Sequence, residues 1–140
     1  MSQDTVLFPG ERQTITRTIL LVEDDPDLGL FLAEALEQEV PYRVIVATNS
    51  HAALQLVQHV TPDLLLIDYG LPGMNGITLY DHMRTNPALA SIPAILLTAS
   101  RYLPQEQLSE RQLLIIEKPF DLETLLATIN TLLASHHSGL

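Results

Sequence analysis

The chain has 140 residues, of which 46% are hydrophobic, so it can bury the core of one ordinary domain. Its 17 acidic residues outnumber its 7 basic residues, which opposes non-specific attraction to nucleic acid or anionic lipid. The absence of cysteine excludes disulfides, thiolate metal sites and cysteine nucleophiles. With no apolar run of membrane-spanning length and no signal-peptide pattern, we expect a cytoplasmic protein without membrane association or direct nucleic-acid binding.

Residues 1–17 show no periodicity and are predicted to form a flexible arm or linker. Beyond them, short aliphatic runs alternate with segments whose apolar residues recur at helical spacing. The runs predict five strands, at residues 18–23, 43–47, 63–67, 93–97 and 113–116. We expect one domain over residues 18–135, followed by a tail at residues 136–140.

The helical segments carry start signals of differing strength. Asp25 is a plausible N-cap with Pro26 at the first helical position, and Asp121 is a plausible cap for the last helix. Ser50 is predicted to cap a second helix whose apolar residues extend to Val60, and a third helix follows the "GLPGMNG" loop. Strands that alternate with helices predict a doubly wound parallel sheet with helices on both faces.

The segment "SRYLPQEQLSERQ", between the fourth and fifth strands, has the weakest helical pattern. Pro104 is suited to a first turn. The only apolar anchors are Tyr102, Leu103 and Leu108.

Polar side chains follow four of the five predicted strands. Glu23 and Asp24 follow the first strand, Asp68 the third, Thr98 the fourth, and Lys118, the single lysine of the chain, the fifth. In an open parallel sheet, ligands bind outside the carboxyl ends of the strands, so these side chains are expected at one edge.

This set of residue types suits a divalent cation and a phosphoryl group. Mg²⁺ prefers oxygen ligands, which Glu23, Asp24 and Asp68 can supply, together with a backbone carbonyl that follows Asp68. A phosphoryl group also needs donors for its oxygens, and Thr98 and Lys118 are suited to that task. Asp25 is interpreted as a helix cap rather than as a ligand.

Four motifs in order resemble the response-regulator receiver domains of the CheY-like family. They are "VEDD" at the end of the first strand, "DYGLPGMNG", "LLTAS" on the fourth strand, and "KPF" after the fifth. Asp24 and Asp68 are 44 residues apart, and Asp68 and Thr98 are 30 apart. The resemblance covers roughly residues 18–134 and implies a flavodoxin-like sheet in the order 2-1-3-4-5.

The resemblance also implies roles. Asp68 would be the phosphoacceptor in a two-component phosphorelay, and Thr98 and Lys118 would contact the phosphoryl group. Glu23, Asp24, Asp68 and the carbonyl of Gly70 would hold Mg²⁺, and the Lys118-Pro119 bond is a candidate for the cis form. The partners implied are a sensor histidine kinase or histidine phosphotransfer protein and an unknown downstream protein, with a phosphorylation-dependent dimer left open.

Two features depart from the family pattern. Ile115 stands where the family carries an aromatic residue, three positions before the lysine, and the Thr98 to Lys118 spacing of 20 residues is shorter than usual. The helix between these residues is therefore expected to be short or irregular, and the output surface to be altered.

Two alternatives stay open beside a phosphorylated switch, whose only catalysis is its own phosphorylation and dephosphorylation. One is an interaction scaffold that keeps the fold without using phosphorylation. The other is a phosphatase of the haloacid-dehalogenase type, although that class needs a second acid where this chain has Gly70.

Overall fold

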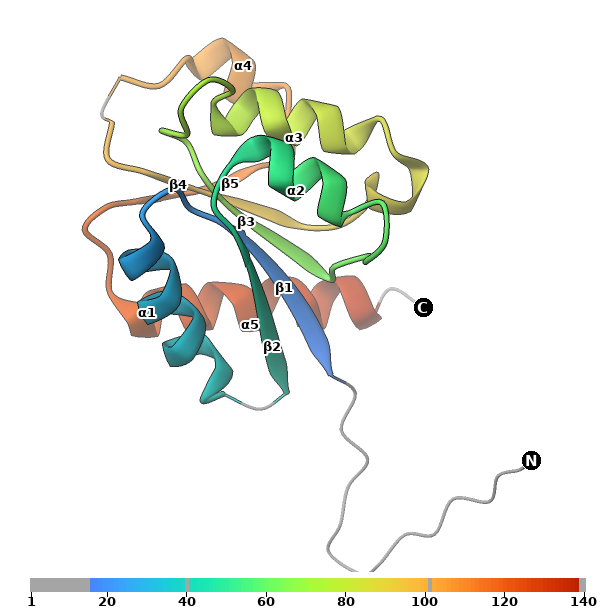
Figure 1. The fold of residues 1–140 in the computed structure, drawn as a ribbon, viewed down its shortest axis with the longest axis vertical. Coiled ribbons are helices and arrows are strands. Elements are labelled where there is room, and N and C mark those ends of the chain that lie inside the picture. Colours follow the sequence, from blue (N-terminus) through green and yellow to red (C-terminus); the bar gives the residue numbers. More distant parts are fainter. Residues whose placement is uncertain (1–15, 40, 101, 139–140) are drawn as a thin grey trace, which may run out of the picture.

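The structure, a computed structural model, describes residues 16–39, 41–100 and 102–138. Five parallel strands form one sheet in the predicted order β2-β1-β3-β4-β5 (Figure 1). Each strand lies within one residue of its predicted ends. The bounds are β1 Arg17–Val22, β2 Tyr42–Ala47, β3 Leu64–Asp68, β4 Ala94–Thr98 and β5 Leu114–Glu117.

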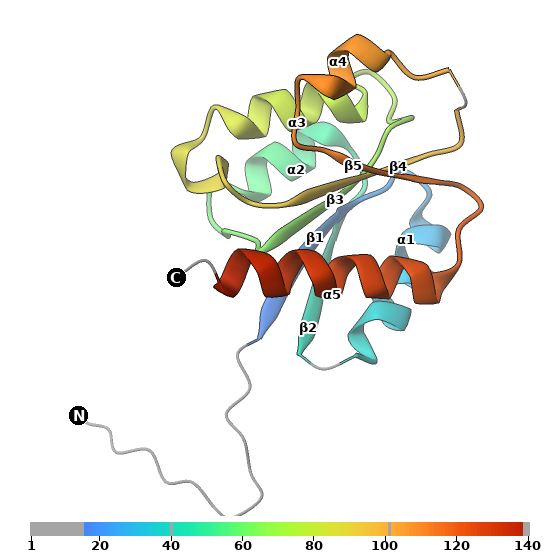
Figure 2. The same ribbon diagram turned by 180° about the vertical axis from the view of Figure 1, so that it is seen from behind.

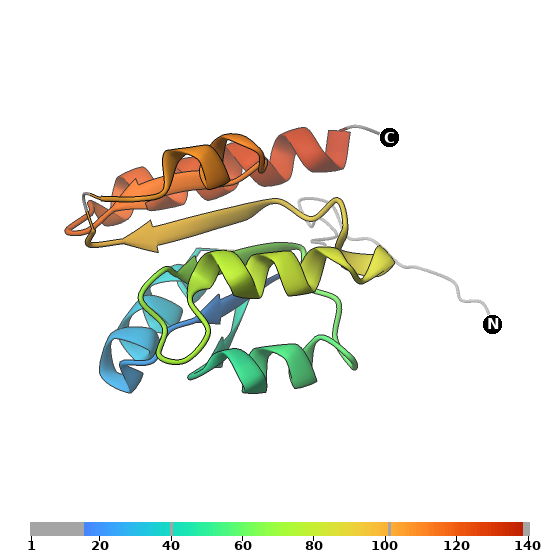
Figure 3. The same ribbon diagram turned by 90° about the horizontal axis from the view of Figure 1, so that it is seen from above.

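Helices cover both faces of the sheet (Figures 1 and 2). The bounds are α1 Pro26–Glu37, α2 Ser50–Leu56, α3 Gly76–Arg84, α4 Gln105–Ser109 and α5 Leu122–Ser138, with a 3₁₀ turn, η1, at Pro87–Leu89. α1 and α5 lie on one face, while α2, α3 and α4 lie on the other, where α2 and α3 run side by side (Figure 3). Among the described residues, no helix is both long and apolar enough to cross a membrane.

At both ends, the secondary structure extends beyond the predicted domain of residues 18–135. Arg17, predicted to end the arm, is the first residue of β1, while residues 1–15 lie outside the described part of the chain. α5 continues to Ser138, three residues into the predicted tail.

The sheet separates two hydrophobic clusters. In β1, Ile19 and Leu21 pack with α1 and α5, whereas Leu20 and Val22 pack with α2, α3 and α4. All five residues of β3 and all five of β4 are buried. This double burial explains why the strands appear in the sequence as continuous aliphatic runs rather than as alternating patterns.

The prediction that Ser50 caps α2 is wrong. Asn49 is the cap, and its side chain accepts a hydrogen bond from the backbone N–H of Ala52 at 2.7 Å. Ser50 is the first helical residue, and its hydroxyl instead donates to the carbonyl of Met74 at 2.9 Å, which ties α2 to the loop after β3. α2 ends at Leu56, four residues before the predicted last apolar position.

α4 is the short helix that the sequence predicts, with five residues. Pro104 occupies its N-cap position and provides no side-chain hydrogen bond, so the helix begins weakly. Leu108 is buried and Leu103 is half-buried, but Tyr102 is 91% exposed. The prediction that Tyr102 anchors this segment in the core is therefore wrong.

Candidate functional site

Three acidic side chains meet at the carboxyl ends of β1 and β3. Glu23 directly follows β1 and is 2% exposed, Asp68 is the last residue of β3 and is 7% exposed, and Asp24 is exposed. One carboxylate oxygen from each residue lies within 4.8 Å of the others. Parallel strands bring these residues together because their carboxyl ends share one edge of the sheet.

Lys118 reaches this cluster from the loop after β5. Its Nζ donates to Oδ1 of Asp68 at 3.1 Å and to Oε1 of Glu23 at 3.3 Å. Its backbone N–H donates to the carbonyl of Thr98 at 2.7 Å, which holds the start of the loop against β4. The Lys118-Pro119 bond, a candidate for the cis form from the resemblance, is cis. The sequence places Glu23 and Lys118 at the same edge of the sheet but does not indicate that they contact each other, as they do in the structure.

Burial and charge act in opposite directions on the two ionic partners. Burial raises the pKa of Glu23, and repulsion from Asp68 adds to this, while a hydrogen bond from the backbone N–H of Asp25 and the charge of Lys118 oppose it. Burial on its own lowers the pKa of Lys118, but the hydrogen bond to Asp68 and the two carboxylate charges outweigh it, so the pKa of Lys118 is raised. Lys118 therefore remains protonated at neutral pH.

Asp25 has the separate role that the sequence indicates. Its Oδ1 accepts hydrogen bonds from the backbone N–H groups of Asp27 at 3.0 Å and Leu28 at 3.3 Å, so it caps α1. Asp25 is also absent from the cluster of closely spaced carboxylates. The run of three acids after β1 thus divides into a cation-competent pair and a helix cap.

Thr98 lies at the same edge of the sheet, at the end of β4. Thr98 is 1% exposed, and its Oγ1 accepts a hydrogen bond from the backbone N–H of Ser100 at 2.9 Å. β3 and β4 are paired with Asp68 opposite Leu97, so Thr98 is one residue beyond the position opposite Asp68. Gly70, in the loop after β3, is exposed, and a β-carbon there would be 3.9 Å from Oδ2 of Asp68.

The acidic cluster fits a small, hard cation. A magnesium ion with octahedral ligands at about 2.1 Å places adjacent ligand oxygens about 3.0 Å apart and opposite ones about 4.2 Å apart, so three oxygens within 4.8 Å of one another must draw closer together to bind one. The donors are all oxygens, and the partly buried setting leaves one side of the cluster, at Asp24, open to solvent. Lys118 supplies positive charge to Glu23 and Asp68 from another side.

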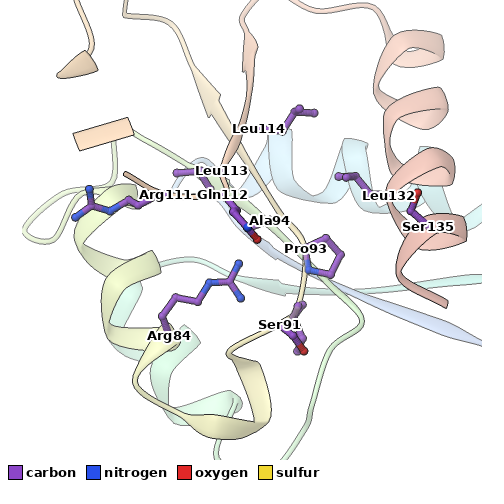
Figure 4. Close-up of a pocket in the computed structure, with 11 residues that line it drawn as sticks. Arg84, Ser91, Pro93, Ala94, Arg111, Gln112, Leu113, Leu114, Leu132 and Ser135 are labelled. Carbon is purple, nitrogen blue, oxygen red and sulfur yellow. The ribbon is translucent and has the colours of Figure 1, made fainter. Parts of the chain in front are cut away.

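A hollow of about 550 Å³ opens at the opposite ends of the strands (Figure 4). Arg84 and Arg111 line it, but Arg84 donates to the carbonyl of Leu89 at 2.7 Å, and Arg111 binds both carboxylate oxygens of Asp81. Because both guanidinium groups already have partners, this hollow offers little to an anionic ligand. The acidic cluster, Thr98 and Lys118 lie instead at the carboxyl ends of the strands.

The fold and the side chains at this edge define a class of protein, a doubly wound α/β domain whose strands carry an acidic, cation-competent cluster and a lysine paired with it at their carboxyl ends. A family model described as the response regulator receiver domain matches residues 19–130. The chain belongs to that family, whose members are regulatory domains of two-component signalling rather than classical enzymes and bind Mg²⁺ at an acidic pocket.

Individual relatives agree with this assignment. The chain is 32% identical over 121 residues to Protein Rrf1 of Nitratidesulfovibrio vulgaris, with 86% of each chain covered. It is 34% identical over 123 residues to the sensor histidine kinase TmoS of Ectopseudomonas mendocina, where the match covers 86% of this chain and 12% of the kinase. The solved receiver domain of a signal transduction histidine kinase from Syntrophus aciditrophicus has a TM-score of 0.74 at 28% identity, and the match covers 86% of this chain and 92% of that one.

Proposed function

We propose that this chain is a phosphorylation-dependent switch in which Asp68 accepts a phosphoryl group from a phosphohistidine of a histidine kinase or phosphotransfer protein. The observation that supports this most directly is the position of Asp68. Its carboxylate is nearly buried at the end of β3, paired with Lys118 at 3.1 Å and adjacent to two further acids. Such a carboxylate can act as a nucleophile only where its neighbours offset the charge of the incoming phosphoryl group.

In this proposal, an oxygen of Asp68 attacks phosphorus, the bond between phosphorus and the donor's imidazole nitrogen breaks, and an acyl phosphate forms. Lys118 then pairs with a phosphoryl oxygen in place of the carboxylate that it holds in this structure. The Thr98 hydroxyl donates to a second phosphoryl oxygen. Mg²⁺, held by Glu23, Asp24, Asp68 and the Gly70 carbonyl, supplies positive charge that offsets the repulsion between carboxylate and phosphate.

The output is a change in affinity for a downstream protein, for which a second copy of the chain is one candidate. Lys118 links the reaction to the surroundings of the site, because it contacts both Glu23 and Asp68 and its backbone is bonded to Thr98. A phosphoryl group on Asp68 rearranges these contacts together.

Two adjacent acids provide a matched experiment. The protein is incubated with Mg²⁺ and a small phosphodonor, and intact mass and base-labile phosphate are measured. We expect the parent and Asp25→Asn, which keeps a competent helix cap, to gain one phosphoryl group. Asp68→Asn should gain none, and Asp24→Asn should lose the phosphorylation that depends on Mg²⁺. Equal labelling of Asp68→Asn and the parent, or no labelling and no response to beryllofluoride, would overturn the proposal.

A phosphorylation-independent scaffold is the second candidate, because Ile115 and the five-residue α4 alter the output side of the sheet. The same set of variants separates the two candidates, since a scaffold would bind its partner equally with Asp68→Asn. A phosphatase of the haloacid-dehalogenase type is disfavoured by Gly70, two positions after Asp68, and by the family assignment. Multiple turnovers of a phosphate ester would be its signature.

A further inference from the structure

The hollow of about 550 Å³ at the amino ends of the strands, which we call the amino-edge hollow, has a mainly apolar lining (Figure 4). Its size lies within the range of about 300–1,000 Å³ of pockets that hold small organic ligands, so it can take two or three apolar side chains. Leu114, the first residue of β5, is 43% exposed. The apolar lining residues come from the starts of β4 and β5 and from α5, and they are Ile92, Pro93, Ala94, Leu113, Leu114 and Leu132.

The two charged residues at this hollow are already engaged. Arg84 donates to the carbonyl of Leu89 at 2.7 Å, and its guanidinium carbon lies 4.5 Å from the centre of the Tyr80 ring. Arg111 is held by both carboxylate oxygens of Asp81. The surface that remains for an occupant is therefore mainly apolar, which favours an apolar side chain over an anion.

Residues 1–15, which we call the arm, precede the described residues and contain one run of large apolar side chains. Residues 6–8 read "VLF", and Pro9 and Gly10 follow them. Proline and glycine suit the two central positions of a type II turn, which reverses the direction of the chain. A reversal is needed here, because β1 runs away from the amino edge of the sheet and the segment before it must turn back to reach that edge.

The start of β1 lies within reach of the amino-edge hollow. In the sheet, Leu20 pairs with Leu65 and Leu65 pairs with Ala94, so Ala94 is level with a residue only three positions after Arg17. β4 and β5 are two and three strand spacings from β1, which is about 10 and 14 Å. The nine residues from Phe8 to Arg17 can span about 30 Å, which leaves length for a turn.

We propose that residues 6–8 of the arm dock in the amino-edge hollow of the same molecule, with the Phe8 ring against Leu114 and Leu132. Docking removes apolar surface from water on both the arm and the hollow. A short linker gives the arm an effective concentration in the millimolar range at its own domain, so docking within one molecule prevails over docking on a second copy at micromolar protein.

The first test uses tryptophan as a reporter, because the chain contains none. Phe8→Trp and a control, Phe31→Trp, are quenched with acrylamide in the native full-length protein and in urea. Phe31 is 62% exposed on α1, so the control reports a solvent-exposed site. We expect the native quenching constant of Phe8→Trp to be severalfold below that of Phe31→Trp, and the two constants to converge in urea. Equal constants in the native protein would overturn the proposal.

Two exposed leucines provide a matched pair of variants in the Phe8→Trp background. Leu114→Asp places a charge in the hollow, whereas Leu30→Asp makes the same change on α1, where Leu30 is 59% exposed. With both variants shown to be folded by circular dichroism, only Leu114→Asp should raise the quenching constant. An unchanged constant in Leu114→Asp means that the arm docks elsewhere, and a constant that rises on dilution means that a second copy supplies the arm. Either result contradicts the proposal.

A second measurement leaves the hollow itself unaltered. Amide NMR spectra of the parent are compared with those of Phe8→Ser and of a control within the arm, Gln3→Ser. Phe8→Ser should shift the resonances of Ile92, Leu113 and Leu114, while Gln3→Ser should not. The absence of shifts at the hollow in Phe8→Ser would refute docking without any change to the folded domain.

The docking does not depend on the proposed phosphorylation, because the hollow and Asp68 lie at opposite ends of the strands. Asp68→Asn in the Phe8→Trp background should therefore keep the low quenching constant. If Phe8→Trp is as exposed as Phe31→Trp in both backgrounds, the docking fails and the proposed function is unaffected.

Discussion

Replacement of Gly76 with alanine tests how closely α3 packs against the end of β3. A β-carbon at position 76 would lie 2.6 Å from the carbonyl oxygen of Asp68, 2.8 Å from Cδ1 of Leu96 and 3.0 Å from the α-carbon of Tyr69. The leucine methyl can rotate away, but the two backbone atoms cannot, and the Gly76 N–H is itself bonded to the Tyr69 carbonyl at 2.9 Å. The start of α3 and the end of β3 must therefore move apart.

Overpacking of this kind costs about 1–3 kcal/mol, and the reduced freedom of alanine in the unfolded chain returns about 0.4–1 kcal/mol. We expect Gly76→Ala to lower the free energy of unfolding by about 1–2 kcal/mol, measured by urea denaturation with an unchanged slope. Mg²⁺ affinity should fall as well, because the clash displaces the backbone of Asp68.

The matched control is Gly70→Ala. Its only near neighbour would be Oδ2 of Asp68 at 3.9 Å, an ordinary contact, so stability should be unchanged or slightly increased. If Gly76→Ala unfolds at the same urea concentration as the parent, or Gly70→Ala is the more damaging change, the packing argument is refuted.

Three further predictions concern helix capping, a buried acid and a surface ion pair. Asp25→Ala should cost about 1 kcal/mol in urea denaturation, while Asp25→Asn should not; an equal loss in both would mean that capping is not the role of Asp25. Burial raises the pKa of Glu23, so without Mg²⁺ its contribution to stability is complete below its usual value of 4.5 and is lost as the pH rises through the raised pKa. Glu23→Gln, which stays neutral, should therefore have a higher urea midpoint than the parent at pH 7 and no advantage below pH 4.5, and an unchanged midpoint at pH 7 would contradict this. Arg111 and Asp81 form a bidentate pair with side chains 20% and 45% exposed, so a double-mutant cycle should give a coupling below about 1 kcal/mol that decreases with salt; a larger, salt-independent coupling would show that solvent does not screen the pair.

The sequence predicts the sheet and most of the site because both depend on local patterns. Strands buried on two faces must be continuously aliphatic, and the residue that ends each run is delivered to one edge by the parallel topology. Asp68 and Lys118 can therefore be placed together although they are 50 positions apart. The start of α1 at Asp25 and Pro26 is equally predictable from the sequence, since both residue types are strongly preferred at the start of a helix.

The features that the sequence does not reveal depend on tertiary contacts. Asn49 and Ser50 are both suitable helix caps. Asn49 caps α2 in the structure, while the Ser50 hydroxyl donates a hydrogen bond to the carbonyl of Met74, 24 positions away. Tyr102 has a large aromatic side chain of the kind that often packs in a core, but it lies outside the core, just before the short α4. The burial of Glu23 and its contact with Lys118 likewise require both strand ends to be in place.

The sheet has a consequence for how this domain can change over time. Its two hydrophobic clusters share strands but no side chains, so substitutions on the side of α1 and α5 and on the side of α2, α3 and α4 should have nearly additive effects on stability. One side can therefore be remodelled, as the five-residue α4 and Ile115 illustrate, while the other keeps its packing. Because the sheet separates the two clusters, a new binding face can evolve on the side of α2, α3 and α4 while the packing against α1 and α5 stays the same.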